Sequence, residues 1–325
     1  MRIQSDVYEA ITAVIIEAIE AGVSNFEMPW HTLSQIPTNA CTGRKYTGIN
    51  ILVLWSLAAK CGYSTQLWAT YQQWKELGAQ VRQGQKSATV VFWKFFGAQQ
   101  DAADSDQDES DADQRTETRC FARAYHVFNA DQVDGFSVPA LSLINESERI
   151  QEAETFFRNA GARVIENGSR AYYDWKSDEI HMPPFHVFKR PDLFYSTLAH
   201  ETIHFTGHES RCNRQLGNRF GSEAYAAEEL IAELGSAFLS AELSLETEPR
   251  FDHAPYVENW LRVLKSDKRA IFTAASKAQQ GAQFLTDAQH KDAASQRRSS
   301  QQGREFYVNL RSFRSTRYSA AVRSS

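Results

Sequence analysis

The sequence predicts an α+β protein of two domains, which span residues 1–135 and 145–285 and precede a flexible basic tail over residues 286–325. Three observations lead to this prediction. A chain of 325 residues is long enough for two domains of ordinary size. The first domain alternates helix and strand patterns, so we expect a mixed α/β fold. In the second domain, three short strand patterns precede long helical ones, which predicts a small antiparallel sheet packed with helices.

The composition is that of an ordinary globular protein, with 42% hydrophobic and 23% charged residues. No apolar run approaches the roughly 20 residues that a membrane span needs. The first residues lack the apolar core of a secretory signal. The four cysteines are scattered without C-x-x-C pairing, as expected for reduced thiols. We therefore expect a cytoplasmic protein with no membrane partner.

Three helices are expected in the first domain. Apolar residues at helical spacing predict an amphipathic helix over residues 6–20, which ends near Gly22. A second, buried helix is expected over residues 50–60. Thr70 and the glutamine three residues later form a capping box, which predicts a short helix directly after it.

Strand patterns follow in the same domain. Val81 and residues 88–96 look like strands around a turn, and another strand is expected over residues 120–128. Residues 101–113 hold seven acids and no aromatic or branched aliphatic residue. We therefore expect a disordered acidic insertion over about residues 98–118, at the tip of a hairpin.

The second domain is expected to begin with a helix over residues 147–159. The strand patterns that follow cover residues 162–166, 170–175 and 179–182, and the helical patterns after them begin at Pro191, Ser222, Tyr256 and Lys268. Beyond residue 290 the chain carries eight Lys or Arg against two acids and shows little apolar periodicity. We expect this tail to be flexible.

The helix that begins near Pro191 carries the sharpest chemical pattern in the chain. His200 and His204 are four residues apart, so on a helix they project from one face and can share a metal ion. Glu201 lies beside that position, where a carboxylate can take a proton from water. This H-E-x-x-H pattern is typical of zinc metallopeptidases, and Gly207 is placed to end the helix.

A catalytic zinc site needs a third protein ligand. The metzincin pattern fails, because position 210 is a serine and His208 comes too early. The next helix offers Glu229 and Glu233, one turn apart at the margin of its apolar stripe, as in the gluzincin arrangement. We expect Glu229 to bind the metal and Glu233 to accept a hydrogen bond from a ligand imidazole. Glu228 is expected on a solvated face, although Glu228 or His208 stays an alternative ligand.

The expected cofactor is Zn²⁺, with Mn²⁺ or another divalent ion as an alternative. Attack of water on a peptide carbonyl also needs a donor for the developing oxyanion. The candidates for that donor are Tyr195, Tyr225, His208 and His253. The pattern alone does not rank them.

Five of the seven tryptophans lie before residue 97, interleaved with lysines and arginines. Aromatic rings beside cations are what single-stranded nucleic acid binding requires, because unpaired bases stack on rings while cations follow the phosphates. The chain nevertheless has a net charge of −5, which argues against a wholly basic nucleic-acid binder. The candidate contacts chosen on this chemistry are Arg44, Lys45, Tyr46, Asn50, Trp68, Trp74, Arg82, Lys86, Trp93 and Lys94.

With both halves considered, the sequence resembles the ArdC family of antirestriction proteins, whose N-terminal part is also similar to that of plasmid TraC-type primases. The motifs that carry the resemblance are T-G-R-K-Y-T-G-I-N (residues 42–50), W-A-T-Y-Q-Q-W (68–74), L-G-A-Q-V-R-Q-G-Q-K (77–86), D-E-I-H-M-P (178–183), Y-S-T-L-A-H-E-T-I-H-F-T-G-H (195–208) and Y-A-A-E-E-L-I-A-E-L (225–234). They occur in order over most of residues 5–285, outside the acidic insertion.

The resemblance implies an N-terminal domain that binds single-stranded DNA and a C-terminal zincin-like metallopeptidase domain. It further implies protection of incoming plasmid DNA from restriction during conjugation, in the cytoplasm or after transfer to a recipient cell. Two alternatives stay open. The metal could be structural in a protein that protects DNA by coating it, or the chain could be a regulatory protease that cleaves a host protein and binds DNA only for localisation. The oligomeric state is not predicted.

Overall fold

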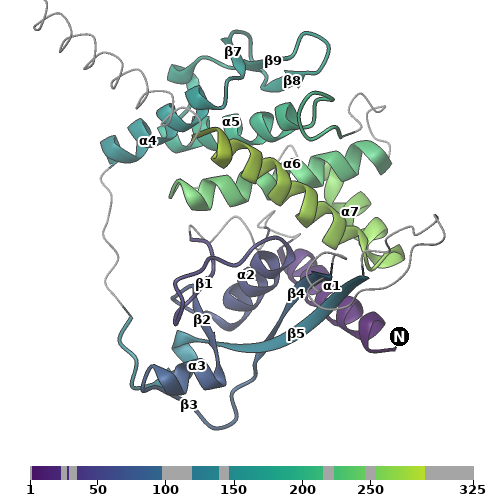
Figure 1. Cartoon of the computed structure of the whole chain (residues 1–325). Helices are drawn as coiled ribbons and strands as arrows, with labels where there is room; N and C mark the ends of the chain where they lie inside the picture. Colours follow the sequence, from purple (N-terminus) through teal and green to yellow (C-terminus); the bar gives the residue numbers. More distant parts are fainter. Residues whose placement is uncertain are drawn as a thin grey trace, which may run out of the picture.

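The computed structural model describes residues 2–22, 28, 35–96, 119–138, 146–214, 223–245 and 254–289. It shows an α+β architecture in two parts (Figure 1), as the sequence predicts. The expected acidic insertion, and the expected tail from residue 290, lie outside the described residues.

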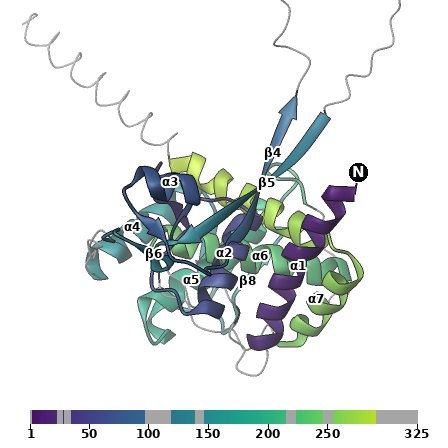
Figure 2. The same cartoon turned by 90° about the horizontal axis from the view of Figure 1, so that it is seen from below.

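A four-stranded sheet forms the framework of the N-terminal part. Its strands are β1 (Thr38–Asn39), β2 (Leu67–Thr70), β4 (Ala88–Phe96) and β5 (Arg119–Asn129), in the order β1-β2-β5-β4. Only β1 and β2 are parallel. The predicted hairpin of β4 and β5 is confirmed, and it extends away from the body of the protein (Figure 2).

Three helices accompany this sheet, close to the predicted positions. They are α1 (Arg2–Gly22), α2 (Ile49–Cys61) and α3 (Tyr71–Glu76), and α2 and α3 pack directly against its strands. The predicted capping box is present, since the Thr70 hydroxyl accepts from the Gln73 backbone and the Gln73 side chain accepts from the Thr70 backbone. Gly62 ends α2 in the left-handed conformation, with φ of 67°.

Val81 and residues 88–96 both lie in strands, as predicted, but these two strands pair with different partners. Val81 belongs to β3 (Gln80–Val81), which pairs with β6 (Val133–Asp134) beyond the short helix η2 (Ala130–Gln132). The reason is packing: Val81 is buried with Trp74 and Val133 in a small second core beneath α3.

The C-terminal part begins with a small sheet and continues as helices. Its elements are α4 (Glu146–Asn159), β7 (Arg163–Glu166), β8 (Tyr172–Asp174), β9 (Glu179–Met182), η3 (Phe185–Val187), α5 (Pro191–Thr206), α6 (Glu223–Glu242) and α7 (Ala254–Ser266). A last helix covers residues 270–289. It therefore continues four residues beyond the predicted start of the tail at residue 286.

The small sheet is mixed, not antiparallel as expected. Its order is β7-β9-β8, and β7 runs parallel to β9. The central place belongs to β9, because this strand carries the fully buried side chains of Ile180 and Met182, whereas most of β7 is exposed. A strand covered on both edges is the one that can present such apolar residues to the helices.

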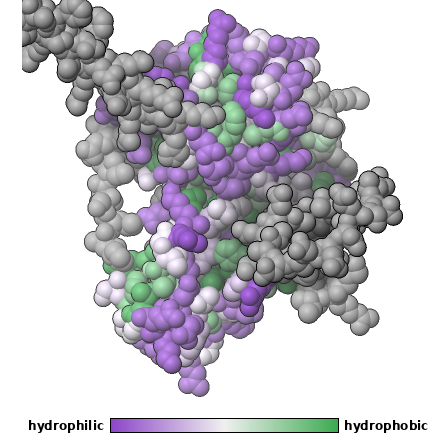
Figure 3. All heavy atoms as spheres, viewed as in Figure 1, coloured by the Kyte–Doolittle hydropathy of each residue, from purple (hydrophilic) through white to green (hydrophobic). Residues whose placement is uncertain are grey.

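One apolar core runs through both parts. Ile11, Ile15 and Ile19 of α1 are buried, and α1 packs against both α2 and α7. The ring of Trp55 on α2 lies 6.0 Å from that of Phe238 on α6. The face seen in Figure 3 is mostly hydrophilic. Within the described residues, no helix is long and apolar enough to cross a membrane.

Candidate metal centre

Helix α5 carries the H-E-x-x-H pattern against α6. Pro191 occupies its first turn, and it ends at Thr206, before Gly207, as predicted. A Cβ at Gly235 on α6 would lie 2.8 Å from Ile203 Cδ1. The missing side chain at Gly235 therefore lets the two helices approach closely. This close packing brings the glutamates of α6 to the histidines of α5.

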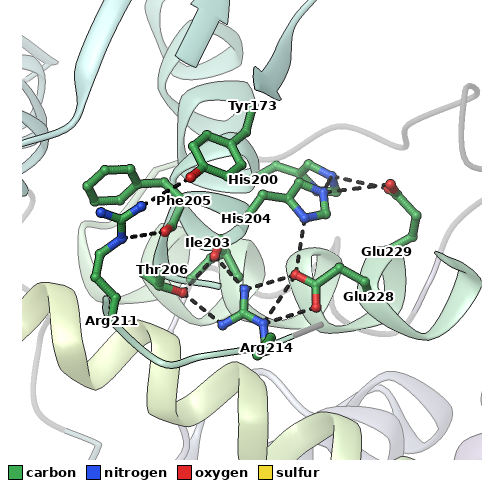
Figure 4. A network of polar contacts seen from close by, with 10 residues as sticks. All are labelled: Tyr173, His200, Ile203, His204, Phe205, Thr206, Arg211, Arg214, Glu228 and Glu229. Atoms are coloured by element: carbon green, nitrogen blue, oxygen red, sulfur yellow. Dashed lines mark hydrogen bonds and ion pairs between the residues drawn. The ribbon is translucent and has the colours of Figure 1, made fainter. Parts of the chain in front are cut away.

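Three donor groups converge at this contact (Figure 4). The Nε2 atoms of His200 and His204 are 3.2 Å apart. The carboxylate of Glu229 lies 3.4 Å from Nε2 of His200 and 3.7 Å from Nε2 of His204. The donor atoms of all three residues lie within 4.8 Å of one another, and the site is largely buried. Two imidazole nitrogens and one carboxylate turned toward a common point are a donor set that fits a divalent metal ion.

Each imidazole also has a carboxylate on its far side. His204 Nδ1 lies 3.2 Å from Oε1 of Glu228, and His200 Nδ1 lies 3.6 Å from Oε2 of Glu233. A carboxylate at Nδ1 keeps the proton on that nitrogen and leaves Nε2 free to bind a metal. The expected place of Glu233 is thus compatible with the structure.

Glu228 is not on a solvated face, which corrects the expectation. It is 9% exposed and makes a two-pronged contact with the guanidinium of Arg214, whose Nε and Nη2 lie 3.0 and 2.9 Å from its oxygens. Arg214 also donates to Oγ1 of Thr206 and to the carbonyl of Ile203. One feature of the sequence does indicate burial: Glu228 stands three residues before Ile231, within the apolar stripe of α6. No comparable feature of the sequence indicates that Arg214 is buried beside Glu228.

Electrostatics favour ionised carboxylates at this site. Burial alone would raise the pKa of Glu228, but hydrogen bonds from His204 and Arg214 outweigh it and hold the pKa below its ordinary value. Burial likewise opposes ionisation of Glu229, and the contacts with His200 and His204 reverse that effect and lower its pKa. A negative Glu229 is the form that a metal ion requires.

The four candidate oxyanion donors differ in their surroundings. The Tyr195 hydroxyl donates to Glu154 on α4 at 2.9 Å, and His208 Nδ1 lies 2.8 Å from the Ser210 hydroxyl. Tyr225 forms a side-chain hydrogen bond with Glu229. Burial raises the pKa of Tyr225 most, and the charge of the Glu229 carboxylate raises it further. His253 lies outside the described residues. Among the described candidates, Tyr225 is the one that contacts the donor set, while Glu201 is buried on α5.

Arg211 forms a second polar cluster that sequence reasoning missed. Its guanidinium bonds Asp178 in the β8–β9 turn and the Tyr173 hydroxyl, and it lies 3.6 Å from the centre of the Phe205 ring. Its Nε donates to the Phe205 carbonyl at the end of α5 (Figure 4). Arg211 therefore ties the small sheet to α5, which carries the candidate metal ligands.

Several predicted DNA contacts lie in the core instead, which corrects those predictions. Trp68 and Trp74 are 1% and 0% exposed, so neither ring can stack on a base. Asn50 and Tyr46 are buried too. The two hydrogen bonds between the Asn50 side chain and the Val91 backbone, each 2.8 Å, give Asn50 a structural role.

The predicted cations divide into two groups. Arg44, Lys45 and Lys86 are exposed, and Lys45 pairs with Glu242 at 3.3 Å. Arg82 bonds the β6 residues Val133 and Asp134, so it supports the small two-stranded sheet. The side chains of Trp93 and Lys94 lie outside the described ones.

Comparison with known families matches the two parts separately. The model of the N-terminal domain of anti-restriction factor ArdC matches residues 5–128, and the model of a zincin-like metallopeptidase matches residues 151–277. The crystal structure of metal-free antirestriction protein ArdC from plasmid R388 is 39% identical, with a TM-score of 0.70 over 87% of this chain and 97% of that chain. Its Mn(II)-bound structure gives a TM-score of 0.68, over 86% and 97%.

Similar sequences also occur among bacterial proteins. An uncharacterized protein, y4eC of Sinorhizobium fredii, is 46% identical over 89% of this chain and 94% of its own length. Two DNA primases TraC of Escherichia coli are each 35% identical. The chain spans only 19% and 28% of the length of these primases.

Proposed function

Because the chain belongs to the ArdC family of antirestriction proteins, we propose that it binds single-stranded DNA and protects incoming plasmid DNA during conjugation. We propose further that its C-terminal part is a metal-dependent peptidase that works beside this DNA-binding activity. The proposed division into an N-terminal DNA-binding domain and a C-terminal zincin-like domain follows the two matched segments.

The convergence of His200, His204 and Glu229 is the observation that carries the peptidase proposal. These residues would hold Zn²⁺, or Mn²⁺ as in the R388 relative. When bound, such an ion would polarise a peptide carbonyl and make water more acidic. Glu233 and Glu228 hold the two imidazoles with Nε2 toward the donor set.

Glu201 is proposed as the general base. A carboxylate next to a ligand histidine can accept a proton from the attacking water and later give it to the leaving amine. Tyr225, which hydrogen-bonds Glu229, orients that carboxylate. The charge of Glu229 is preserved at neutral pH because its pKa is lowered by the two histidines despite burial.

Two measurements test this function. Binding of matched single- and double-stranded oligonucleotides is titrated with salt, and tighter, salt-dependent binding of the single strand is expected. A flat salt response, or equal affinity for both forms, would reject the DNA assignment. For the peptidase, Glu201→Gln should keep the metal content of the wild type and lose hydrolysis of any peptide that the wild type cleaves; full retained activity would reject Glu201 as the base.

A regulatory protease that cleaves a host protein is the second candidate. The donor set is intact and has a carboxylate behind each imidazole, which favours this protease over a DNA-coating protein whose metal is only structural. Recipient cells that carry Glu201→Gln distinguish protection by proteolysis from protection by coating of the DNA. Lost protection with unchanged DNA binding supports proteolysis as the protective act, whereas unchanged protection supports coating of the DNA.

A further inference from the structure

We propose that a hollow between the N-terminal part and the helix over residues 270–289 binds one unpaired nucleotide of single-stranded DNA. This inference rests on the proposed function and gives it a site. The hollow measures about 700 Å³, within the roughly 300–1,000 Å³ typical of small-ligand pockets. Its walls come from α1, the start of α2, β4 and the last helix, so it combines residues of both matched segments.

The charge of the hollow suits a phosphate. Among the described residues, its lining includes Arg269 and Lys277 and no aspartate or glutamate, although the whole chain has a net charge of −5. Both cations are exposed, and neither forms an ion pair among the described residues. The neighbouring Lys268, in contrast, pairs with Glu9 at 2.5 Å. Two unpaired cations in a concave site attract an anion more strongly than cations on a flat surface.

Aromatic rings supply a stacking surface in the same place. Tyr8 and Phe272 meet edge to face with ring centres 4.5 Å apart, and the Arg269 guanidinium lies 5.4 Å from the centre of the Tyr8 ring. Phe92 faces the hollow from β4 and is 47% exposed. An exposed ring of this size beside free cations is the combination that binds an unpaired base and its phosphate.

The Phe92 ring also continues into a row along the sheet. Tyr125 on β5 lies edge to face with it at 5.5 Å, and Arg123 lies 5.2 Å from the centre of the Tyr125 ring. Phe92 is paired with Arg123 in the strand register. The row offers further rings and a cation to the nucleotides that follow the one in the hollow.

The hollow is preformed. The Gly48 backbone N–H donates to the Gln279 side chain at 3.1 Å, which joins the loop before α2 to the last helix. Asn50 fixes the Val91 backbone through two hydrogen bonds, so the position of β4 relative to α2 is set. Thr47 and Ser276 present exposed hydroxyls that can reach the polar edge of a base. A preformed site loses little conformational entropy on binding.

The test measures binding of a fluorescent 15-nucleotide oligo-dT to the full chain by anisotropy, over a series of salt concentrations. The double variant Arg269→Gln/Lys277→Gln should bind at least about tenfold more weakly. Its salt slope should fall by about 0.7, because the loss of one neutralised single-strand phosphate removes about that much. The matched control is Arg170→Gln/Lys176→Gln, which removes two exposed cations that do not line the hollow. It should change the slope far less.

A second variant tests the rings. Phe92→Ala should weaken binding by roughly tenfold, the order expected for one lost stacking contact, and leave the salt slope unchanged. Light-activated crosslinks from 5-iodouracil in the oligonucleotide should map to peptides that contain Tyr8, Phe92 or Phe272. This measurement uses the wild type, so it decides the matter even if a variant is unstable.

The possible failures are distinguishable. If the wild type prefers single strands but the double variant weakens no more than its control, or crosslinks map elsewhere, the hollow is not the site and the proposed function stands. If the wild type shows no such preference, both proposals fall. If poly-glutamate competes fully and Phe92→Ala has no effect on DNA binding, the hollow holds an acidic protein segment and the nucleotide assignment is wrong.

Discussion

The two glutamates behind His200 and His204 are held differently. Glu228 is clamped by Arg214, whose guanidinium is itself anchored to the end of α5 through Thr206 and Ile203. Glu233 is 2% exposed and lies against His200. Because Arg214 compensates the charge of Glu228, this carboxylate can stay ionised inside the protein and keep the His204 ring oriented.

Removal of Arg214 should be costly. Arg214→Met leaves Glu228 buried without its cation, so the free energy of unfolding should fall by about 3–5 kcal/mol. Urea unfolding at neutral pH measures this loss. Arg163→Met is the matched control, since Arg163 pairs with Glu179 at the surface, and it should cost less than about 1 kcal/mol. Equal losses in the two variants would contradict the assigned role of Arg214.

The clamp between Arg211 and Asp178 predicts a dependence of stability on pH. The hydrogen bond from Arg211 holds the pKa of Asp178 below its usual range, despite some opposing burial. The folded pKa is depressed, so this stabilisation is present above the unfolded pKa of about 3.9 and is lost as pH falls through the folded value. Asp178→Asn should therefore be less stable at pH 7 and lose less stability than the wild type between pH 5 and pH 3. If the urea midpoints of the wild type and Asp178→Asn fall by the same amount between pH 5 and pH 3, the contact between Arg211 and Asp178 is not the cause of the pH dependence.

At the scale of elements, the metal centre depends on how closely α5 and α6 pack. A Cβ at Gly235 would meet the Cδ1 and Cγ1 atoms of Ile203 at 2.8 Å, so Gly235→Ala should separate the helices and cost about 1–3 kcal/mol. Titration with Mn²⁺ should show weaker binding as well, because the donor set spans both helices. Ile203→Val in the same chain should restore part of both losses. If the double variant recovers neither stability nor Mn²⁺ binding, the contact between residues 203 and 235 is not the cause of the two losses.

The helices at this site were predictable because long amphipathic patterns with end signals specify them locally. Apolar spacing predicted α5 and α6, and the four-residue spacing of the histidines placed them on one face. The partners of very short strands were not predictable. Two-residue strands such as β3 depend on the tertiary contact with β6, and no local pattern encodes that pairing.

Side-chain exposure was the other limit of sequence reasoning. Trp68 and Trp74 lie in a segment with many cations, yet their burial is decided by the strands and helix that cover them. The exposure of Phe92 cannot be predicted from the sequence, because strand periodicity in β4 does not reveal which face of the sheet is covered. The role of Arg214 could not be predicted for a related reason, because it depends on a contact between the segment after α5 and Glu228 on α6.

At the scale of the whole molecule, the two parts share one core. Unfolding should therefore be a single transition, with tryptophan fluorescence and far-ultraviolet circular dichroism giving the same midpoint. Phe238→Ala, which removes a ring beside Trp55, should lower both midpoints together and cost about 3–5 kcal/mol. Two separate transitions in urea would show that the parts unfold independently.

The last helix also determines where the chain can be cut. Residues 151–277 correspond to the zincin-like family, but the helix continues to residue 289. Ala278, Ala282 and Leu285 are almost fully buried, and a Cβ at Gly281 would lie 2.8 Å from Oγ1 of Thr206 at the end of α5. A fragment that stops at residue 277 would remove this cover from α5. A fragment of the zincin-like part prepared for biochemistry should instead extend through residue 289.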